Sequence, residues 1–369
     1  MSKPKISIII AVYNTEKYLP QCLNSLLDQT FKEIEIICID DCSTDSSPQI
    51  LKKYSTKDKR IKILQHQKNL GQAAARNLGI QHAKGEYIMF CDSDDYYDIS
   101  MCEKLYHAID SHNVDIAMCG IKVIYHTEQH MRLTDQEYYR VKFYGHHYIN
   151  DEIIEKIDMA PTNKIFRHAQ LERICLEFPH GLRFEDAYFV VCYLAACRSI
   201  YFIDDKLYFY IRHANSTMSD VWSEESEQDY ASDHLEIAIK IHEFLTEHQL
   251  IEKYNKVYWR LFLEYLLFAA NLSKTPAKGR AVRARAKAFT IEHSDELDHA
   301  DKVTRRSIKQ ISRNFRHFTS RVWGFCLRTS LKFRPLFKLQ SWSIPALEKI
   351  NDSTNSIEAK LREINRIKE

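Results

Sequence analysis

The chain has 369 residues, of which 45% are hydrophobic and 28% are charged, and its formal net charge is only +2. This composition excludes wholesale disorder, and the eight glycines and eight prolines are too few for a collagen-like or linker-like chain. No apolar stretch reaches the roughly 20 residues of a transmembrane helix, and the N-terminal residues lead directly into a strand pattern without a signal-peptide core. Because the ten cysteines are also spaced singly, without a CxxC pair, we expect a cytoplasmic protein with reduced cysteines.

Strand and helix patterns alternate over the first 120 residues. The β-branched run at 6–12 is typical of a strand that is buried on both faces. Alternation of this kind predicts an α/β fold with a parallel sheet, in which ligands bind beyond the carboxyl ends of the strands. Acidic residues at 40–41 and 92–95 both follow strand ends, so we expect them to face one cleft. In chain order the predicted elements are strand 6–12, helix 19–27, strand 34–39, strand 61–64, helix 73–83 and strand 86–91.

The pattern changes in the second half of the chain. Residues 121–160 are irregular and rich in Tyr and His. From residue 230 onwards the apolar spacing is helical, which divides the chain into a first domain, 1–225, and a helical region, 226–369. The predicted helices of that region are 230–250, 252–272, 280–292 and 302–330.

The main chemical signal is the run Asp92-Ser93-Asp94-Asp95 at the end of an apolar strand. Three carboxylates within four residues repel one another unless a cation joins them. Carboxylate oxygens suit Mg²⁺ or Mn²⁺, and such ions commonly bridge carboxylates and the phosphates of a substrate. The alternative is a solvated acidic turn that caps a helix.

Several further motifs resemble those of glycosyltransferase family 2, whose members are inverting enzymes with the GT-A nucleotide-binding fold. Their order and spacing hold over residues 4–98, and a weaker match continues to residue 220. The resemblance implies a donor-binding half, 1–98, and an acceptor-binding half, 99–225. The matching segments are 6–14, 25–30, 39–45, 69–71, 75–79 and 85–88, followed by the acidic run.

The resemblance implies roles in binding the nucleotide of the donor. Tyr13 would pack against uracil with Ala11 beside it, although an aromatic residue at a strand end is otherwise typical of a core. Asp41 would accept a hydrogen bond from the base. Asn69 and Arg76 are further donor-site candidates, and Arg76 could instead form an internal ion pair.

The resemblance also assigns the metal, Mn²⁺ or Mg²⁺, to the acidic run. Asp94 would be the principal ligand, and Asp92 would contact both the ribose and the metal, with Ser93 beside it at the donor site. His213 is a third candidate ligand, but a single histidine can equally be structural.

The segment 208–217 resembles the loop that closes over the donor diphosphate. Arg212 offers a bidentate phosphate donor and Ser216 offers a hydroxyl. In the family pattern an arginine often follows an aromatic residue directly, whereas Ile211 intervenes here. The phosphate contact of Arg212 is therefore left open.

The segment 183–189 resembles the acidic pair that supplies the general base of the family. In an inverting transfer a carboxylate takes the proton of the acceptor hydroxyl during direct displacement. We assign the base to Asp186 and an orienting role to Glu185. A Glu-Asp pair alone is typical of a surface, but its position after the family-like segment 163–166 favours catalysis.

The segment 302–338 contains eleven Lys or Arg and no Asp or Glu, with apolar residues at helical spacing. An amphipathic helix of this composition is typical of binding to an anionic membrane surface. The alternative is a helix that packs on the first domain or on a second subunit, as in a homo-oligomer. Nucleic acid is a poorer fit, because no reading motif accompanies the charge.

The leading hypothesis is therefore a metal-dependent inverting glycosyltransferase. It would move a hexose or N-acetylhexosamine from a UDP-sugar to a hydroxyl of a glycan acceptor, at the inner face of the cell membrane. By family analogy the acceptor belongs to lipo-oligosaccharide, capsule or teichoic acid synthesis, with a lipid-linked glycan as one option. The rival hypothesis is a non-catalytic membrane-associated scaffold on the same fold.

Overall fold

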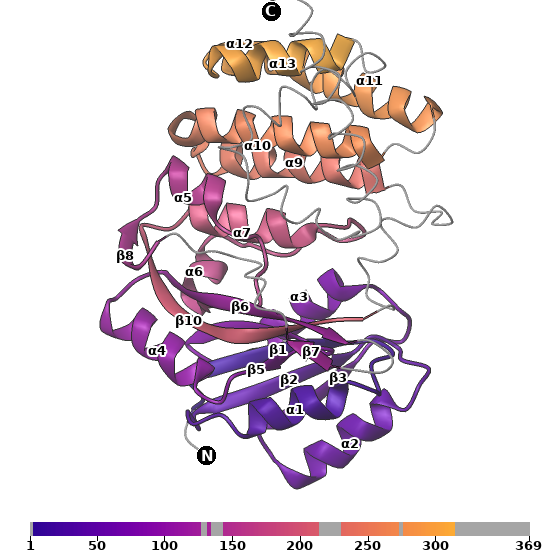
Figure 1. Cartoon of the computed structure of the whole chain (residues 1–369), viewed down its shortest axis with the longest axis vertical. Coiled ribbons are helices and arrows are strands. Elements are labelled where there is room, and N and C mark those ends of the chain that lie inside the picture. The colour runs from indigo at the N-terminus through magenta and orange to yellow at the C-terminus, as the bar shows by residue number, and fades with distance from the viewer. Residues whose placement is uncertain (1–2, 127–130, 134–142, 214–229, 273–275, 314–369) are drawn as a thin grey trace, which may run out of the picture. The chain divides into compact units, whose positions relative to one another are not determined.

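The computed structural model describes residues 3–126, 131–133, 143–213, 230–272 and 276–313. These residues belong to one compact unit, Met1–Phe318. Figure 1 shows a sheet covered by helices, followed by further helices toward the C-terminus. This is the α/β fold with a helical C-terminal region that the sequence predicts.

The N-terminal half of the sheet is parallel, with the strand order β3-β2-β1-β4. Every residue of β2 is buried and nearly every residue of β1, because α1 and α2 cover one face of the sheet and α3 covers the other (Figure 1). This arrangement explains the continuous β-branched runs. The bounds are β1 (Ile6–Val12), α1 (Leu19–Leu27), β2 (Ile34–Asp40), α2 (Ser47–Lys57), β3 (Ile61–Gln65), α3 (Gln72–His82) and β4 (Tyr87–Asp92).

The second half of the sheet is mixed, and it continues from β4 in the order β9-β6-β10-β5. Strand β9 is antiparallel to both β4 and β6, whereas β10 is parallel to β6. The long strand β10 pairs with β5, so the residues after β4 lie beside the end of β10. The bounds are β5 (Tyr96–Tyr97), α4 (Met101–Ser111), β6 (Ile116–His126), β7 (Met131–Leu133), β8 (Gly145–Tyr148), α5 (Asp151–Lys156), β9 (Lys164–Arg167), α6 (His168–Arg173), α7 (Glu185–Ala195) and β10 (Ser199–Arg212).

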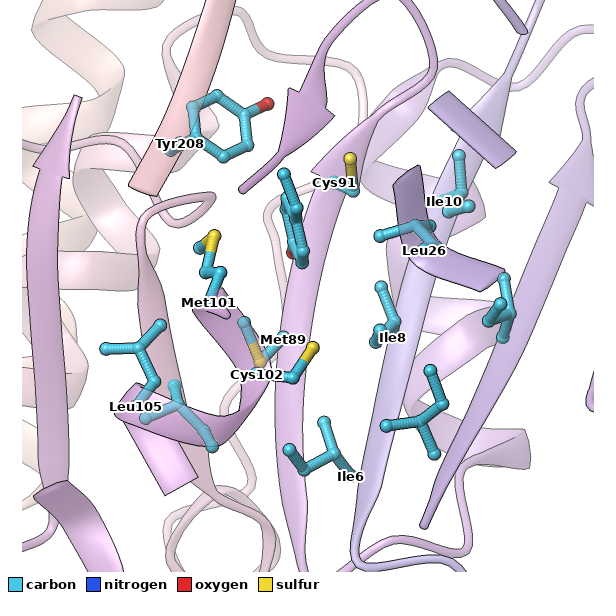
Figure 2. Packing of buried hydrophobic residues seen from close by; sticks show 14 of the residues in the cluster. Ile6, Ile8, Ile10, Leu26, Met89, Cys91, Met101, Cys102, Leu105 and Tyr208 are labelled. Carbon is cyan, nitrogen blue, oxygen red and sulfur yellow. The ribbon is translucent and has the colours of Figure 1, made fainter. Parts of the chain in front are cut away.

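One hydrophobic cluster of the core lies against the face of the sheet that α1 and α4 cover. Ile6, Ile8 and Ile10 form one row along β1, as expected for alternate residues of a strand (Figure 2). Leu26 of α1 and Met89 of β4 pack in the same cluster. This cluster packs α1 onto strands β1 and β4.

The C-terminal part of the chain is helical as predicted, as far as the structure describes it, to residue 313. Helix α9 packs on α7 and α10, and α10 also packs on α5. Among the described residues, none of the helices is both long and apolar enough to cross a bilayer. The bounds are α9 (Tyr230–Glu247), α10 (Ile251–Leu272), α11 (Pro276–Glu292), α12 (Ser294–Asp298) and α13 (Lys302–Arg313).

Two sequence predictions fall wholly or partly on residues that the structure does not describe. The proposed domain boundary at 225/226 lies within 214–229, so the division stays a prediction. Most of the basic segment 302–338 lies beyond residue 313. Its described part is α13, in which Thr304 and Ile308 are buried.

Candidate active site

The carboxyl ends of β1, β2 and β4 bring the predicted donor-site residues to one edge of the sheet. Ala11 pairs in register with Asp92 on one side, and Val12 pairs with Asp40 on the other. The two acidic runs therefore flank the end of β1, where the sequence predicts them to converge. Tyr13, the next residue, is 46% exposed, so its ring is accessible at this edge.

Arg76 of α3 is the cation at the centre of the site. Its guanidinium is buried and binds three carboxylates: Asp92 at 2.9 Å, Asp186 at 2.5 Å and Glu185 at 3.4 Å. The ring of Phe178 lies 5.2 Å from the guanidinium carbon. One arginine against three carboxylates leaves an excess of negative charge. Of the two roles expected for Arg76 the structure contains the internal ion pair, and a contact with the donor stays a prediction.

Close packing of α3 on the sheet places Arg76 there. A Cβ at Gly79 would lie 2.4 Å from Cγ2 of Ile9, so only glycine allows α3 to approach β1 so closely. Gln72 lies one turn before Arg76 on the same face of α3, and its amide also donates to Glu185. Gln72 is not among the residues predicted from the sequence, although its i, i+4 spacing from Arg76 is a signal for it.

Asp41 shapes the loop that leads into α3. Its carboxylate accepts hydrogen bonds from the backbone N–H of Leu70 at 2.9 Å and of Gly71 at 2.7 Å, and it lies 2.6 Å from Nδ1 of His66. Asn69 Oδ1 also accepts from Gly71 N–H. Both residues therefore order this loop, and the contacts predicted for them with the donor stay predictions.

The carboxylates of the acidic run point to three different partners. Asp92 faces Arg76, and Asp94 lies 2.9 Å from Nε2 of His213. Asp95 is buried and accepts hydrogen bonds from the hydroxyl of Tyr208 at 2.6 Å and the N–H of Ile211 at 2.7 Å. Asp95, which is not among the predicted metal ligands, therefore has its partners on β10.

Asp94 and His213 fit a divalent cation. They bring a carboxylate oxygen and an imidazole nitrogen together, and Asp92 stands in the same turn. Nδ1 of His213 is buried and has no hydrogen-bond partner among the described residues, while the ring stacks on Tyr18. A mixed oxygen and nitrogen set suits Mn²⁺ better than Mg²⁺, which prefers oxygen. Tyr18 carries no sequence signal that could have predicted its place.

Glu185 and Asp186 begin helix α7, where the positive end of the helix dipole favours carboxylates. The side chain of Glu185 is buried, whereas that of Asp186 is 33% exposed. Burial raises the pKa of Asp186 to about 7, and Glu185 and Asp92 add to this rise while Arg76 opposes it. An accessible carboxylate that titrates near neutrality beside a buried partner suits the predicted base and orienting roles.

Three further residues predicted at the donor site are Ser93, Arg212 and Ser216. Ser93 is buried within the acidic run, and Arg212 is the last residue of β10, beside His213. Ser216 lies outside the described residues. Their predicted contacts with the donor stay predictions.

Comparison with known proteins agrees with this architecture. Residues 7–175 match the family model described as Glycosyl transferase family 2. EpsH of Bacillus subtilis (strain 168), a protein named as a glycosyltransferase, is 32% identical over 265 residues. The match covers 69% of this chain and 73% of EpsH. Glycosyltransferase GlyG of Streptococcus pneumoniae is 34% identical over 231 residues, covering 58% of this chain and 72% of GlyG.

A solved structure shows the same fold. TarS of Staphylococcus aureus, a poly(ribitol-phosphate) β-N-acetylglucosaminyltransferase, is 35% identical over 211 residues, covering 56% of this chain and 35% of TarS. The crystal structure of TarS residues 1–349 in complex with UDP-GlcNAc matches with a TM-score of 0.56 and 24% identity, covering 84% of this chain and 91% of that one. The chain thus belongs to glycosyltransferase family 2, and it is a glycosyltransferase built on the GT-A fold.

Proposed function

We propose that the protein is a metal-dependent inverting enzyme that moves a hexose or N-acetylhexosamine from a UDP-sugar to a hydroxyl of a surface-glycan acceptor. The observation that carries this proposal is the Arg76 network, which holds Asp186 beside the acidic run at the strand ends. Among the relatives, TarS is named for transfer of N-acetylglucosamine to poly(ribitol-phosphate) and is solved with UDP-GlcNAc. The rival scaffold hypothesis has no support from these relatives, which are named as transferases.

In the proposed reaction Asp186 acts as the general base. Its carboxylate takes the proton of the acceptor hydroxyl while that oxygen bonds to the anomeric carbon and the bond from this carbon to the diphosphate breaks. Arg76, which also binds Glu185, holds Asp186 in place. A divalent cation held by Asp94, His213 and Asp92 would neutralise charge on the departing diphosphate. Tyr13 would stack on the uracil, and Arg212 would bind phosphate.

The acceptor and the membrane are part of the same proposal. A teichoic acid acceptor is favoured by the similarity to TarS, with lipo-oligosaccharide and capsule as the other members of the class. Binding of the basic segment 302–338 to an anionic membrane would place the enzyme at the inner face of the membrane, close to a lipid-linked acceptor. Pairing of the C-terminal helices in a homo-oligomer is the alternative use of that segment.

The first experiment is a thermal-shift series with UDP-GlcNAc, UDP-glucose and UDP-galactose, each with and without Mn²⁺. We expect one donor to raise the melting temperature only when Mn²⁺ is present, because a ligand that binds only the folded state stabilises it. Asp94→Asn should abolish this shift. Asp186→Asn should keep the shift but lower kcat by about 10²–10⁴-fold, the usual contribution of a general base. Full turnover by Asp186→Asn would refute the assignment of the base.

A further inference from the structure

Two histidines and a glutamate meet in the helical region, away from the acidic run and Arg76. His242 lies in α9, His293 follows the last residue of α11, and Glu296 lies in α12. In the sequence His242 and Glu296 are 54 residues apart. Packing of α11 against α9 and α12 brings the three side chains together.

The geometry is close to that of a metal site. Nε2 of His242 lies 2.6 Å from one oxygen of Glu296, and Nδ1 of His293 lies 3.3 Å from the other. One ligand atom from each of the three residues lies within 4.8 Å of the others. In a tetrahedral zinc site with bonds of about 2.0–2.1 Å, neighbouring ligand atoms stand about 3.4 Å apart. Small side-chain rotations would therefore convert this cluster into a coordination shell.

The surroundings fit a zinc ion as well. Burial lowers the pKa of His242, which favours the neutral ring that a metal ligand requires. Its other nitrogen, Nδ1, lies 3.5 Å from the hydroxyl of Thr246, an outer contact that orients the ring. The rings of Trp259 and Phe289 line the inner side, with centroids 6.4 and 5.1 Å from that of His242.

The outer side of the cluster is open to solvent. The side chains of His293 and Glu296 are 22% and 32% exposed, which leaves an entry path and room for water as a fourth ligand. Two imidazoles and one carboxylate with an open fourth position form a known zinc ligand set. Without a metal the same groups would form only a hydrogen-bonded pair of histidines on one carboxylate.

We propose that His242, His293 and Glu296 bind one Zn²⁺, which joins α12 to α9. This site is distinct from the catalytic cation at Asp94, and the proposal does not depend on the donor or acceptor. The ion would link the segment that leads into α13 to the helix that packs on the catalytic helix α7. Through this link the ion would stabilise the packing of α11 on α9 and on α12.

The test is zinc titration of the tag-free full chain carrying Asp94→Asn, which removes a ligand of the competing site. Isothermal calorimetry should give one Zn²⁺ per chain. His293→Gln and Glu296→Gln, both at partly exposed positions, should each weaken binding by at least about 10–100-fold, the usual cost of disturbing a metal shell. His299→Gln is the matched control, since His299 is exposed in the same segment.

Absorption spectroscopy with Co²⁺ is a second test of the metal site. Co²⁺ at this site should give the visible absorption of a tetrahedral ion, and that absorption should be lost in His293→Gln but kept in His299→Gln. Absence of stoichiometric Zn²⁺ binding would overturn the proposal, leaving a hydrogen-bonded cluster. Equal affinity in the control and in both ligand variants would also overturn it. Circular dichroism confirms that each variant is folded before it is compared.

Discussion

Arg76 links distant segments of the chain, since its guanidinium binds Asp92, the last residue of β4, and also Asp186 in α7, which lies 110 residues from Arg76 in the sequence. Without the guanidinium, the three carboxylates would repel one another with no opposite charge to compensate them. The guanidinium suits this position because its fork of N–H donors can reach several acceptors, whereas a lysine is a point charge.

Arg76→Ala should therefore destabilise the protein by about 3–5 kcal/mol, the usual cost of removing one partner of a buried ion pair. Chemical denaturation of the purified variant measures this change. The control is Lys104→Ala, which removes an exposed pair with Asp205 and should cost less than about 1 kcal/mol. If the two changes lowered the free energy of unfolding equally, the Arg76 network would contribute no more than an exposed ion pair.

Asp186 should make the reaction depend on pH. Its pKa is raised to about 7 by burial, and a general base must be ionised. We therefore expect kcat/KM to rise with pH through about 7 and then to level off. A pH-rate profile in Mn²⁺-saturated buffer measures it, and a profile that is flat between pH 5.5 and 8.5 would contradict the assignment.

At the scale of elements, α9 supports the turn that carries the base. Phe184 directly precedes Glu185 and has a φ of 66°, in the left-handed region. Its ring stacks on that of His234 of α9, with the ring centroids 3.8 Å apart. Burial lowers the pKa of His234 to about 3, and neither ring nitrogen has a hydrogen-bond partner among the described residues. The ring thus behaves as a neutral aromatic side chain that holds Phe184 in place.

This packing predicts acid sensitivity. Below about pH 6.5 the unfolded chain protonates His234 but the folded chain does not, so the stability falls as pH falls, by about 1.4 kcal/mol per pH unit. His234→Phe keeps the ring and removes this linkage, so between pH 6.5 and 5.5 it should lose about 1 kcal/mol less than the unaltered protein. Urea denaturation at the two pH values measures the difference. Parallel losses in the two proteins would show that His234 is protonated in the fold.

At the scale of the whole molecule, the basic segment raises the question of where the enzyme works. We expect the full chain to sediment with vesicles that contain phosphatidylglycerol and not with neutral phosphatidylcholine vesicles. Each basic residue near an anionic surface contributes about 1 kcal/mol. Replacing Arg321, Arg328, Lys332, Arg334 and Lys338 by Gln should therefore abolish sedimentation. Unchanged sedimentation, or a change in oligomeric state alone, would favour the subunit-packing alternative.

Much of this protein is determined by the sequence alone. The β-branched runs predict buried parallel strands, the acidic residues at 40–41 and 92–95 mark the strand ends, and the ordered motifs identify the family. These features depend on neighbouring residues, because strand propensity, turn chemistry and motif spacing are local. The helical C-terminal region follows from local periodicity in the same way.

The tertiary structure alone decided which partner each polar group has. Within the acidic run Asp92 faces an arginine, Asp94 a histidine and Asp95 a tyrosine, although the residue types are identical. The burial that raises the pKa of Asp186, the stacking of His234 on Phe184 and the meeting of His242 with His293 depend likewise on distant segments. Contacts between residues far apart in the chain, and the exclusion of water around them, exist only once the fold has formed. These contacts set the charge and position of each functional side chain.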